Sequence, residues 1–145
     1  MADLAVTAAN VLASAATSTA TRTTGVAGEA IAIGQTVYID AAASSVIKLA
    51  DANVSLAAST VRGIAITGAS AAGQPVTYAT ADTAFTHGLT GVTAGAVIYQ
   101  SNTPGAMTLT YGDLTSAASY VSVLGVATSA TQMILNITRT AALKA

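Results

Sequence analysis

Through most of this chain, apolar side chains recur at every second residue, which is the spacing of a β-strand and not of a helix. In the segment 132–138, Met133, Leu135 and Ile137 would share one face of an extended strand. Short runs of this kind are rich in Val, Ile, Thr and Tyr and are separated by Gly-containing turns, as in β-sandwiches and β-barrels. The pattern predicts an all-β fold, a compact barrel or sandwich over residues 25–145.

The chain also repeats itself. Gly-Gln-Thr-Val-Tyr at 34–38 returns as Gly-Ala-Val-Ile-Tyr at 95–99, a step of 61 residues (95 − 34). Gly-Ile-Ala at 63–65 returns as Gly-Val-Ala at 125–127, a step of 62 residues (125 − 63). A β-unit of this size has one apolar face that it cannot bury alone, so we expect two copies to pair and close a core. The expected halves are residues 25–80 and residues 86–140.

Residues 1–24 differ from the rest, since they contain only four large apolar side chains, Leu4, Val6, Val11 and Leu12, apart from the starting Met. A segment that buries so little cannot offset its ordering entropy by itself. Three interpretations remain open: a frayed terminus, a short helix that places several apolar residues on one face, and an extended or disordered arm that becomes ordered on a partner.

Composition argues against a nucleic-acid partner and against cysteine chemistry. Only 8% of the residues are charged, against roughly 25% in an average globular protein, and the net charge is −1. The few cations are scattered, whereas phosphate binding needs clustered Lys and Arg. We therefore expect no nucleic-acid partner. The chain has no cysteine, so it forms no disulfide and has no thiolate chemistry.

No membrane or export signal is apparent. The N-terminus has no Lys or Arg before Arg22, so it lacks the basic start of a secretion signal. The long uncharged stretch at 83–112 contains five Gly and one Pro and many Thr, unlike a membrane span. We expect a soluble protein that is made in the cytoplasm and has no membrane partner.

The residues that could carry chemistry are sparse. His87 is the single histidine and is interpreted as a turn residue. The nearest acid in sequence is Asp82, five residues earlier in an expected loop. Asp40, Asp51 and Asp113 each follow an expected strand, where Asp commonly serves turns. We expect no catalytic residue, metal site or cofactor, and a protein that is not an enzyme. A hydrolase assembled from distant aspartates is the least favoured alternative.

Several motifs together resemble one family. They are Ala-Gly-Glu-Ala-Ile at 27–31, the repeat at 34–38, Lys-Leu-Ala-Asp at 48–51, Val-Arg-Gly-Ile-Ala at 61–65, Ala-Gly-Gln-Pro-Val at 72–76, Tyr-Gln-Ser-Asn-Thr-Pro-Gly at 99–105 and Leu-Gly-Val-Ala at 124–127. Their order resembles that of small tailed-bacteriophage head proteins, called capsid decoration, cement or head-fibre proteins. Residues 46–87 are also loosely similar to lambda-type head decoration proteins, although residues 1–24 lack the Gly and Pro richness of that relative's arm.

The resemblance implies a β-rich homotrimer on the outer surface of an expanded capsid, assembled in the host cytoplasm. Its partner would be the major capsid protein, and it would cement neighbouring capsomers against the pressure of packaged DNA. Residues 1–24 would form the capsid-binding arm, with contacts from Asp3, Leu4, Val6, Val11, Leu12 and Arg22. The alternative is a trimeric head-fibre or tail-associated protein that binds a receptor or glycan.

Overall fold

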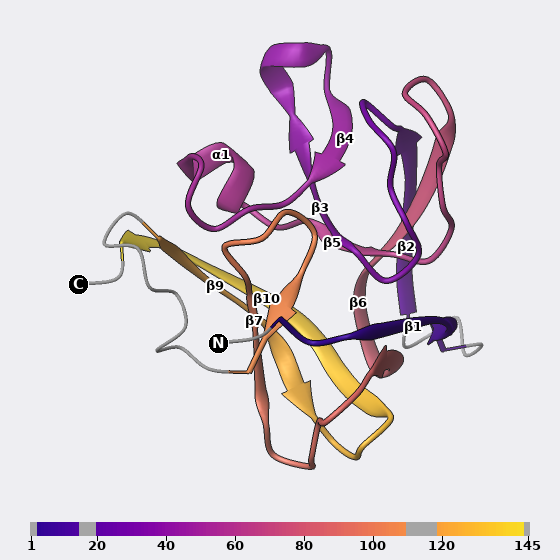
Figure 1. The fold of residues 1–145 in the computed structure, drawn as a ribbon, viewed down its shortest axis with the longest axis vertical. Coiled ribbons are helices and arrows are strands. Elements are labelled where there is room, and N and C mark those ends of the chain that lie inside the picture. The colour runs from indigo at the N-terminus through magenta and orange to yellow at the C-terminus, as the bar shows by residue number, and fades with distance from the viewer. Residues whose placement is uncertain (1–2, 15–19, 110–118, 144–145) are drawn as a thin grey trace.

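The structure, a computed structural model, describes residues 3–14, 20–109 and 119–143. The fold is all-β, as the sequence predicts, and its antiparallel sheet of ten strands curls into a half-barrel (Figure 1). The strands are β1 (Val6–Leu12), β2 (Ala20–Val26), β3 (Thr36–Asp40), β4 (Val46–Leu49), β5 (Gly63–Ala65), β6 (Pro75–Leu89), β7 (Val97–Gln100), β8 (Met107–Thr108), β9 (Tyr120–Ala127) and β10 (Gln132–Leu143). A 3-10 helix (Ala41–Ala43) and a single α-helical turn, α1 (Leu56–Ser59), lie between strands.

The strand order reads the same from either end. Across the sheet it is β4-β3-β5-β6-β10-β9-β7-β8, and β1 and β2 pair additionally with β6. In this order β3 is equivalent to β7, β5 to β9, β4 to β8 and β6 to β10. The sheet therefore consists of two copies of a four-stranded unit, which meet along the antiparallel pair β6–β10.

The pairing registers of the two copies agree residue by residue. The residues that lie side by side on three neighbouring strands are Thr36, Ile64 and Ala79 in the first copy, and Val97, Val126 and Ile134 in the second. On the first two strands the steps between equivalent residues are 61 (97 − 36) and 62 (126 − 64), as in the repeated motifs, and on the third strand the step is 55 (134 − 79). The internal duplication predicted from the sequence is thus present in the backbone pairing.

The repeated Gly-x-x-x-Tyr motif has one structural role in both copies. Gly34 and Gly95 stand in the turns before β3 and β7 with φ angles of 90° and 87°. This left-handed region is costly for residues with a Cβ atom. Tyr38 and Tyr99 then occupy equivalent, half-buried positions on the two strands. The motif marks the start of the same strand in each copy.

Both copies contribute to the larger of two hydrophobic clusters. Its buried members include Ile64, Phe85, Ile98, Met107, Leu124 and Met133. A smaller cluster, around Val37, Ile47 and Tyr78, belongs to the first copy alone. Because the larger cluster draws on both copies, the two halves share a core and form one domain.

A buried glutamine also joins the copies. Gln100, at the end of β7, is 0% exposed, and its Oε1 accepts a hydrogen bond from the hydroxyl of Thr36 on β3. Its Nε2 donates to the carbonyl oxygen of Ala50 at 2.9 Å. This amide satisfies polar groups that the contact between the two halves would otherwise leave buried without partners.

The N-terminal residues belong to the same sheet. β1 and β2 both pair with β6, β1 with its C-terminal end and β2 with its N-terminal half. The boundary expected at residue 24 therefore falls inside β2. Of the forms considered for the arm, the extended one is observed, and the helical one is not. These residues form strands because the backbone N–H and C=O groups of β6 are available to pair with those of β1 and β2. An isolated segment would have no such partner.

Candidate functional site

The first strand is exposed and irregularly paired with the sheet. β1 pairs with β6 at Val6–Leu89, Val11–His87 and Leu12–Thr86. Between the first two of these pairs, β1 advances five residues (11 − 6) while β6 advances two (89 − 87). The extra residues form a bulge in β1, and residues 7–10 are exposed. Bulges of this kind redirect side chains and commonly occur next to functional sites.

Gly88 makes the bulge possible. Its φ angle is 64°, and a Cβ atom there would lie 2.6 Å from the carbonyl oxygen of Thr7 and 2.9 Å from Cγ2 of Val11. Any other residue would push β1 off the sheet in addition to straining the backbone. The close approach of β1 to β6 therefore depends on this glycine.

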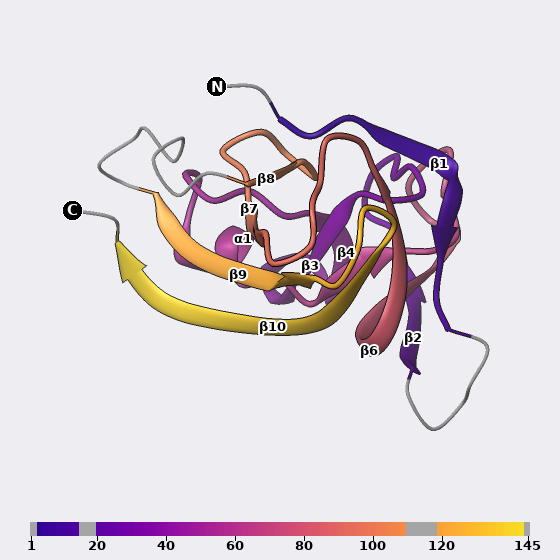
Figure 2. The same ribbon diagram turned by 90° about the horizontal axis from the view of Figure 1, so that it is seen from below.

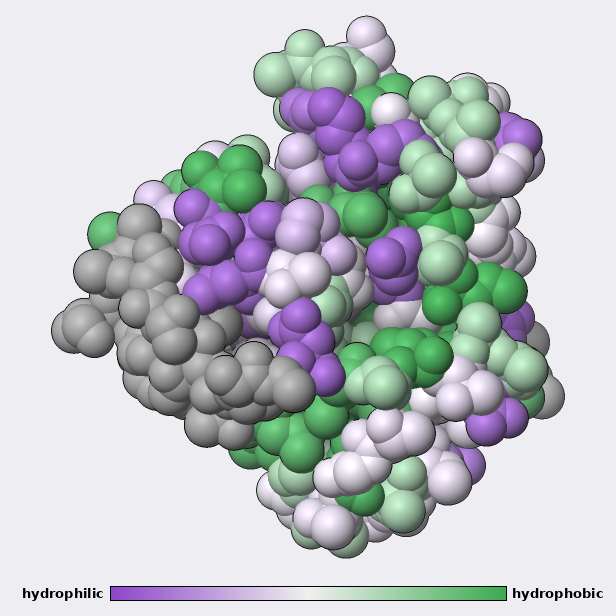
Figure 3. Space-filling model, in the orientation of Figure 1, coloured by the Kyte–Doolittle hydropathy of each residue, from purple (hydrophilic) through white to green (hydrophobic). Residues whose placement is uncertain are grey.

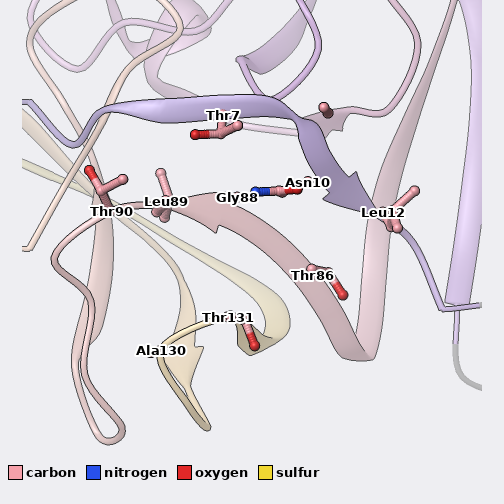
Figure 4. A pocket seen from close by; sticks show the side chains of 10 residues that line it. Thr7, Asn10, Leu12, Thr86, Gly88, Leu89, Thr90, Ala130 and Thr131 are labelled. Atoms are coloured by element: carbon pink, nitrogen blue, oxygen red, sulfur yellow. The ribbon is translucent and has the colours of Figure 1, made fainter.

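A groove of about 350 Å³ lies between β1, the end of β6 and the turn between β9 and β10. Figure 4 shows β1 along one side of the groove and β6 along the other. Its lining comprises Thr7, Ala9, Asn10, Leu12, Thr86, Gly88, Leu89, Thr90, Ala130 and Thr131. These residues supply hydroxyls, one amide and two leucines but no charge. The groove can accept a neutral segment that makes hydrogen bonds, but it has no group suited to acid–base chemistry.

The structure places the four predicted apolar contact residues differently from one another. Val11 is 4% exposed and lies in the larger core cluster, and Leu4 and Val6 are half-buried against that cluster. Leu12 points outward and is 60% exposed. In this fold Val11 is a core residue, and Leu12 is the member of the set that a partner could reach.

Of the two predicted charged contact residues, Asp3 fastens the N-terminal segment to the body, and Arg22 joins two parts of that segment. The carboxylate of Asp3 accepts a hydrogen bond from the hydroxyl of Ser101, just after β7. Nη2 of Arg22, on β2, donates to the carbonyl oxygen of Ser14 at 2.8 Å. Both side chains are exposed, so each keeps a face that a partner could contact.

Asp82 does not lie in the loop that the sequence suggested. It is a buried residue of β6, 2% exposed, and its carboxylate accepts hydrogen bonds from the backbone N–H groups of Ser14 at 2.6 Å and Ala84 at 3.0 Å. A buried carboxylate requires such donors. The bond to Ser14 holds the chain just after β1 and crosses 68 residues of sequence, so no local pattern could reveal it.

His87 is not the turn residue that the sequence suggested either. It lies in β6 and is 0% exposed. Its Nδ1 accepts a hydrogen bond from the N–H of Leu89 at 2.9 Å, while Nε2 has no partner among the described residues. Burial lowers the pKa of the imidazole, and an interaction with the backbone of Ser129 offsets part of this change. The following Gly88 resembles a turn signal, which hid the strand.

The turn role predicted for the other aspartates is confirmed where the structure describes them. Asp40 caps the 3-10 helix by accepting from the N–H of Ala42 at 3.2 Å, and Asp51 accepts from the N–H of Asn53 at 3.1 Å. The ammonium of Lys48 hydrogen-bonds Asp40 and lowers the pKa of that carboxyl, whereas burial raises the pKa of Asp51. Asp113 lies outside the described residues.

A second exposed apolar surface lies on β9 and β10. Val126 and Ile134 are directly opposite one another and are 40% and 43% exposed. They border a shallow depression of about 240 Å³ together with Val123, Gly125, Asn136 and Thr138. No charged side chain lines this depression, which makes it a second candidate contact surface.

Comparison of the chain with protein-family models, curated proteins and solved structures found no match. Within the described ranges, no helix has the length and apolar character needed to cross a membrane. In the same residues, no three His, Cys, Asp or Glu side chains gather into a group that could hold a metal ion. The function is therefore argued from the surfaces themselves.

Proposed function

We propose that this protein is a structural virion protein that binds the outer surface of a phage capsid as a homotrimer. It would cement neighbouring capsomers of the major capsid protein against internal DNA pressure. The observation that carries this proposal is the exposed, bulged strand β1, which pairs with β6 on one edge and with no other described strand. A free strand edge is a common place for another chain to add a strand.

The neutral surface also supports this role. On the face shown in Figure 3, much of the surface is white or pale green, the colours of residues with intermediate hydropathy. Ala, Gly, Ser and Thr allow two surfaces to approach closely without burying charge, which is costly. Many weak contacts of this kind add up when a protein occupies many equivalent sites on one shell.

For the contact between subunits of the trimer, the surface around Val126 and Ile134 is the best candidate. The two side chains form an exposed apolar pair on a sheet face. Cyclic assemblies bury such patches against another part of an identical subunit. The role proposed here is binding alone, without an enzymatic reaction, a nucleic-acid partner or a membrane partner, at the outer surface of virions assembled in the host cytoplasm.

The test is co-sedimentation of the purified protein with expanded heads of the phage that encodes it. Removing residues 1–24 would also remove β1 and most of β2, so a point substitution is a sharper probe. Leu12→Asp places a charge on the exposed side chain at the groove, and Val54→Asp is its matched control because Val54 is 70% exposed outside the groove. Wild type and Val54→Asp should pellet saturably, and Leu12→Asp should not. Equal pelleting of all three would reject β1 as the docking element.

The trimer is tested separately by sedimentation equilibrium. Ile134→Asp should shift the protein toward monomer, whereas Leu12→Asp should leave the association state unchanged. A wild-type protein that remains monomeric at high concentration and on heads would rule out the trimer.

A second function is favoured by the polar lining of the groove. The hydroxyls of Thr7, Thr86, Thr90 and Thr131 and the amide of Asn10 are neutral hydrogen-bonding groups of the kind that suits a glycan. If wild-type protein fails to pellet with heads but binds saturably on a glycan array, the receptor- or glycan-binding alternative replaces the capsid role.

A further inference from the structure

His87 lies where three parts of the fold meet. Its direct neighbour across the ladder is Val11 of β1, and directly opposed residues of antiparallel strands point to the same side. Both side chains are buried. The N–H of His87 donates to the carbonyl oxygen of Thr131 at 3.0 Å, in the turn between β9 and β10. β1 therefore helps to separate the imidazole from water.

The hydrogen bonds of the imidazole fit only its neutral form. Because Nδ1 accepts from the N–H of Leu89, the ring proton is on Nε2. A second proton would have to go on Nδ1, where it would point at the N–H that Nδ1 now accepts. Nε2 makes no hydrogen bond with any described residue, and the backbone of Ser129 offsets only part of the effect of burial on the pKa, so the positive charge would also be poorly solvated.

No charged side chain close by would stabilise an imidazolium. β1 and the turn at 128–131 contain no ionisable residue. On β6 the carboxylate nearest in sequence is Asp82, five residues earlier, and it is bonded to the N–H groups of Ser14 and Ala84. On β10 it is Arg139, whose Nη1 donates to the carbonyl oxygen of Val61 at 2.8 Å. Protonation would thus require the structure around the ring to open.

We propose that His87 is an acid-sensitive latch for the N-terminal strand: protonation of its imidazole releases β1 from β6. β1 can open more easily than the buried strands, because it is largely exposed and its pairing with β6 is interrupted by a bulge. Lifting it would break the pairs at Leu89 and His87 and admit water to the imidazole. This would let the protonated ring become solvated without unfolding the sheet.

The latch would control the groove. Four of its ten lining residues, Thr7, Ala9, Asn10 and Leu12, come from β1. Release of β1 in acid would dismantle that wall and free the strand for another sheet edge. The inference concerns the chain itself and does not depend on the proposed capsid role.

The direction of the pH dependence follows from the lowered pKa of His87. In the released state the imidazole titrates near its ordinary value of about 6.5, so that state binds more protons than the closed state below this pH. The closed state is then lost as the pH falls from about 6.5 toward the lowered pKa, by up to about tenfold per pH unit. Above that window the latch has no effect.

The experiment is NMR on the full-length protein between pH 7 and pH 5. This range lies above the ordinary pKa of aspartate, which is about 3.9. His87 is the single histidine, so its ring signal is unambiguous. Amide protection factors, corrected for the intrinsic effect of pH, are compared for Val11 and Leu12 and for the reference hairpin β3–β4. We expect the protection factors of Val11 and Leu12 to fall by up to about tenfold per pH unit below pH 6.5, while those of the hairpin stay constant.

His87→Asn is the matched variant, because its side-chain oxygen can accept from the N–H two residues on but cannot be protonated. Its β1 protection should be independent of pH in this window. If the smaller side chain prevents folding, His87→Phe fills the volume without a titrating group and serves the same comparison. The latch is rejected if wild-type β1 and the hairpin lose protection equally, if β1 protection does not change, or if the folded variant retains the wild-type pH dependence.

Discussion

Gly63 and Gly125 meet the same neighbour in the two copies of the repeat: the backbone of the next strand. A Cβ atom on Gly63 would lie 2.3 Å from the carbonyl oxygen of Ala79, and a Cβ atom on Gly125 would lie 1.9 Å from that of Ile134. Ala79 and Ile134 are themselves equivalent in the pairing. Both copies therefore require a glycine at the same point of close approach between strands.

Gly125→Ala should destabilise the fold by about 3 kcal/mol, because a backbone carbonyl cannot rotate away from the added methyl group. Gly63→Ala should act in the same direction. Chemical denaturation measures both. Gly73→Ala is the control, since a Cβ atom there would meet nothing within 4 Å and adds only the strain of its φ angle of 89°, about 1 kcal/mol. Equal losses at Gly73 and Gly125 would contradict the close approach.

Gln100 and Thr36 should show energetic coupling. Gln100→Met leaves the buried Thr36 hydroxyl without its acceptor, at a cost of about 2 kcal/mol. Thr36→Val removes the same bond from the other side. In a double-mutant cycle, the double variant should be more stable than the sum of the single losses predicts, by about 1 kcal/mol. Strict additivity would show that the hydrogen bond between the copies contributes nothing.

Substitutions of Val11 and Leu12 should have different effects on stability, because the first residue lies in the core and the second on the surface. Val11→Ala removes two methyl groups from the core and should lower the free energy of unfolding by about 2 kcal/mol. Leu12→Ala, one residue away, should change it by less than about 0.5 kcal/mol, since the side chain is 60% exposed. Thermal or urea denaturation distinguishes the two. A larger loss at Leu12 would mean that β1 lies in the opposite register.

The pKa of Asp40 should rise toward its ordinary value in Lys48→Met, because the Nζ of Lys48 donates to its carboxylate at 2.8 Å. Lys48→Arg, which keeps the charge, should retain most of the lowering. NMR titration of the carboxyl carbon measures both variants. The stabilisation by this pair is present above the unfolded pKa of about 3.8 and is lost as the pH falls through the lowered folded value. Since the pair is partly exposed, its effect on stability should be small.

Local pattern was enough to predict much of the fold. The alternation of apolar residues predicted strands, and the repeated glycines predicted a duplication that the ladder registers reproduce. Asp40 and Asp51 serve turns because their hydrogen bonds reach only two residues along the chain. Features whose hydrogen-bond partners are close in sequence could therefore be predicted.

Features whose partners lie far away in the sequence could not be predicted. β6 runs for fifteen residues, and the Asp, His and Gly within it resemble loop signals. Each is accommodated by contacts from elsewhere: Asp82 by Ser14, His87 by the turn at Thr131, and Gly88 by the carbonyl of Thr7. The seven residues of β1 are largely exposed and become a strand only because β6 lies beside them. The strand order likewise depends on pairings that no single segment encodes.

The two-copy sheet has a consequence for how such a molecule can diversify. In a dimer of two separate identical chains, every substitution appears in both subunits. Here the two copies are covalently joined, so each position can change independently. The chain shows this freedom: β6 carries the additional strands β1 and β2 and their groove, while its equivalent β10, in the described part of the chain, pairs only with β6 and β9. One copy can thus carry a specialised surface while the other keeps only the pairings of the repeated sheet.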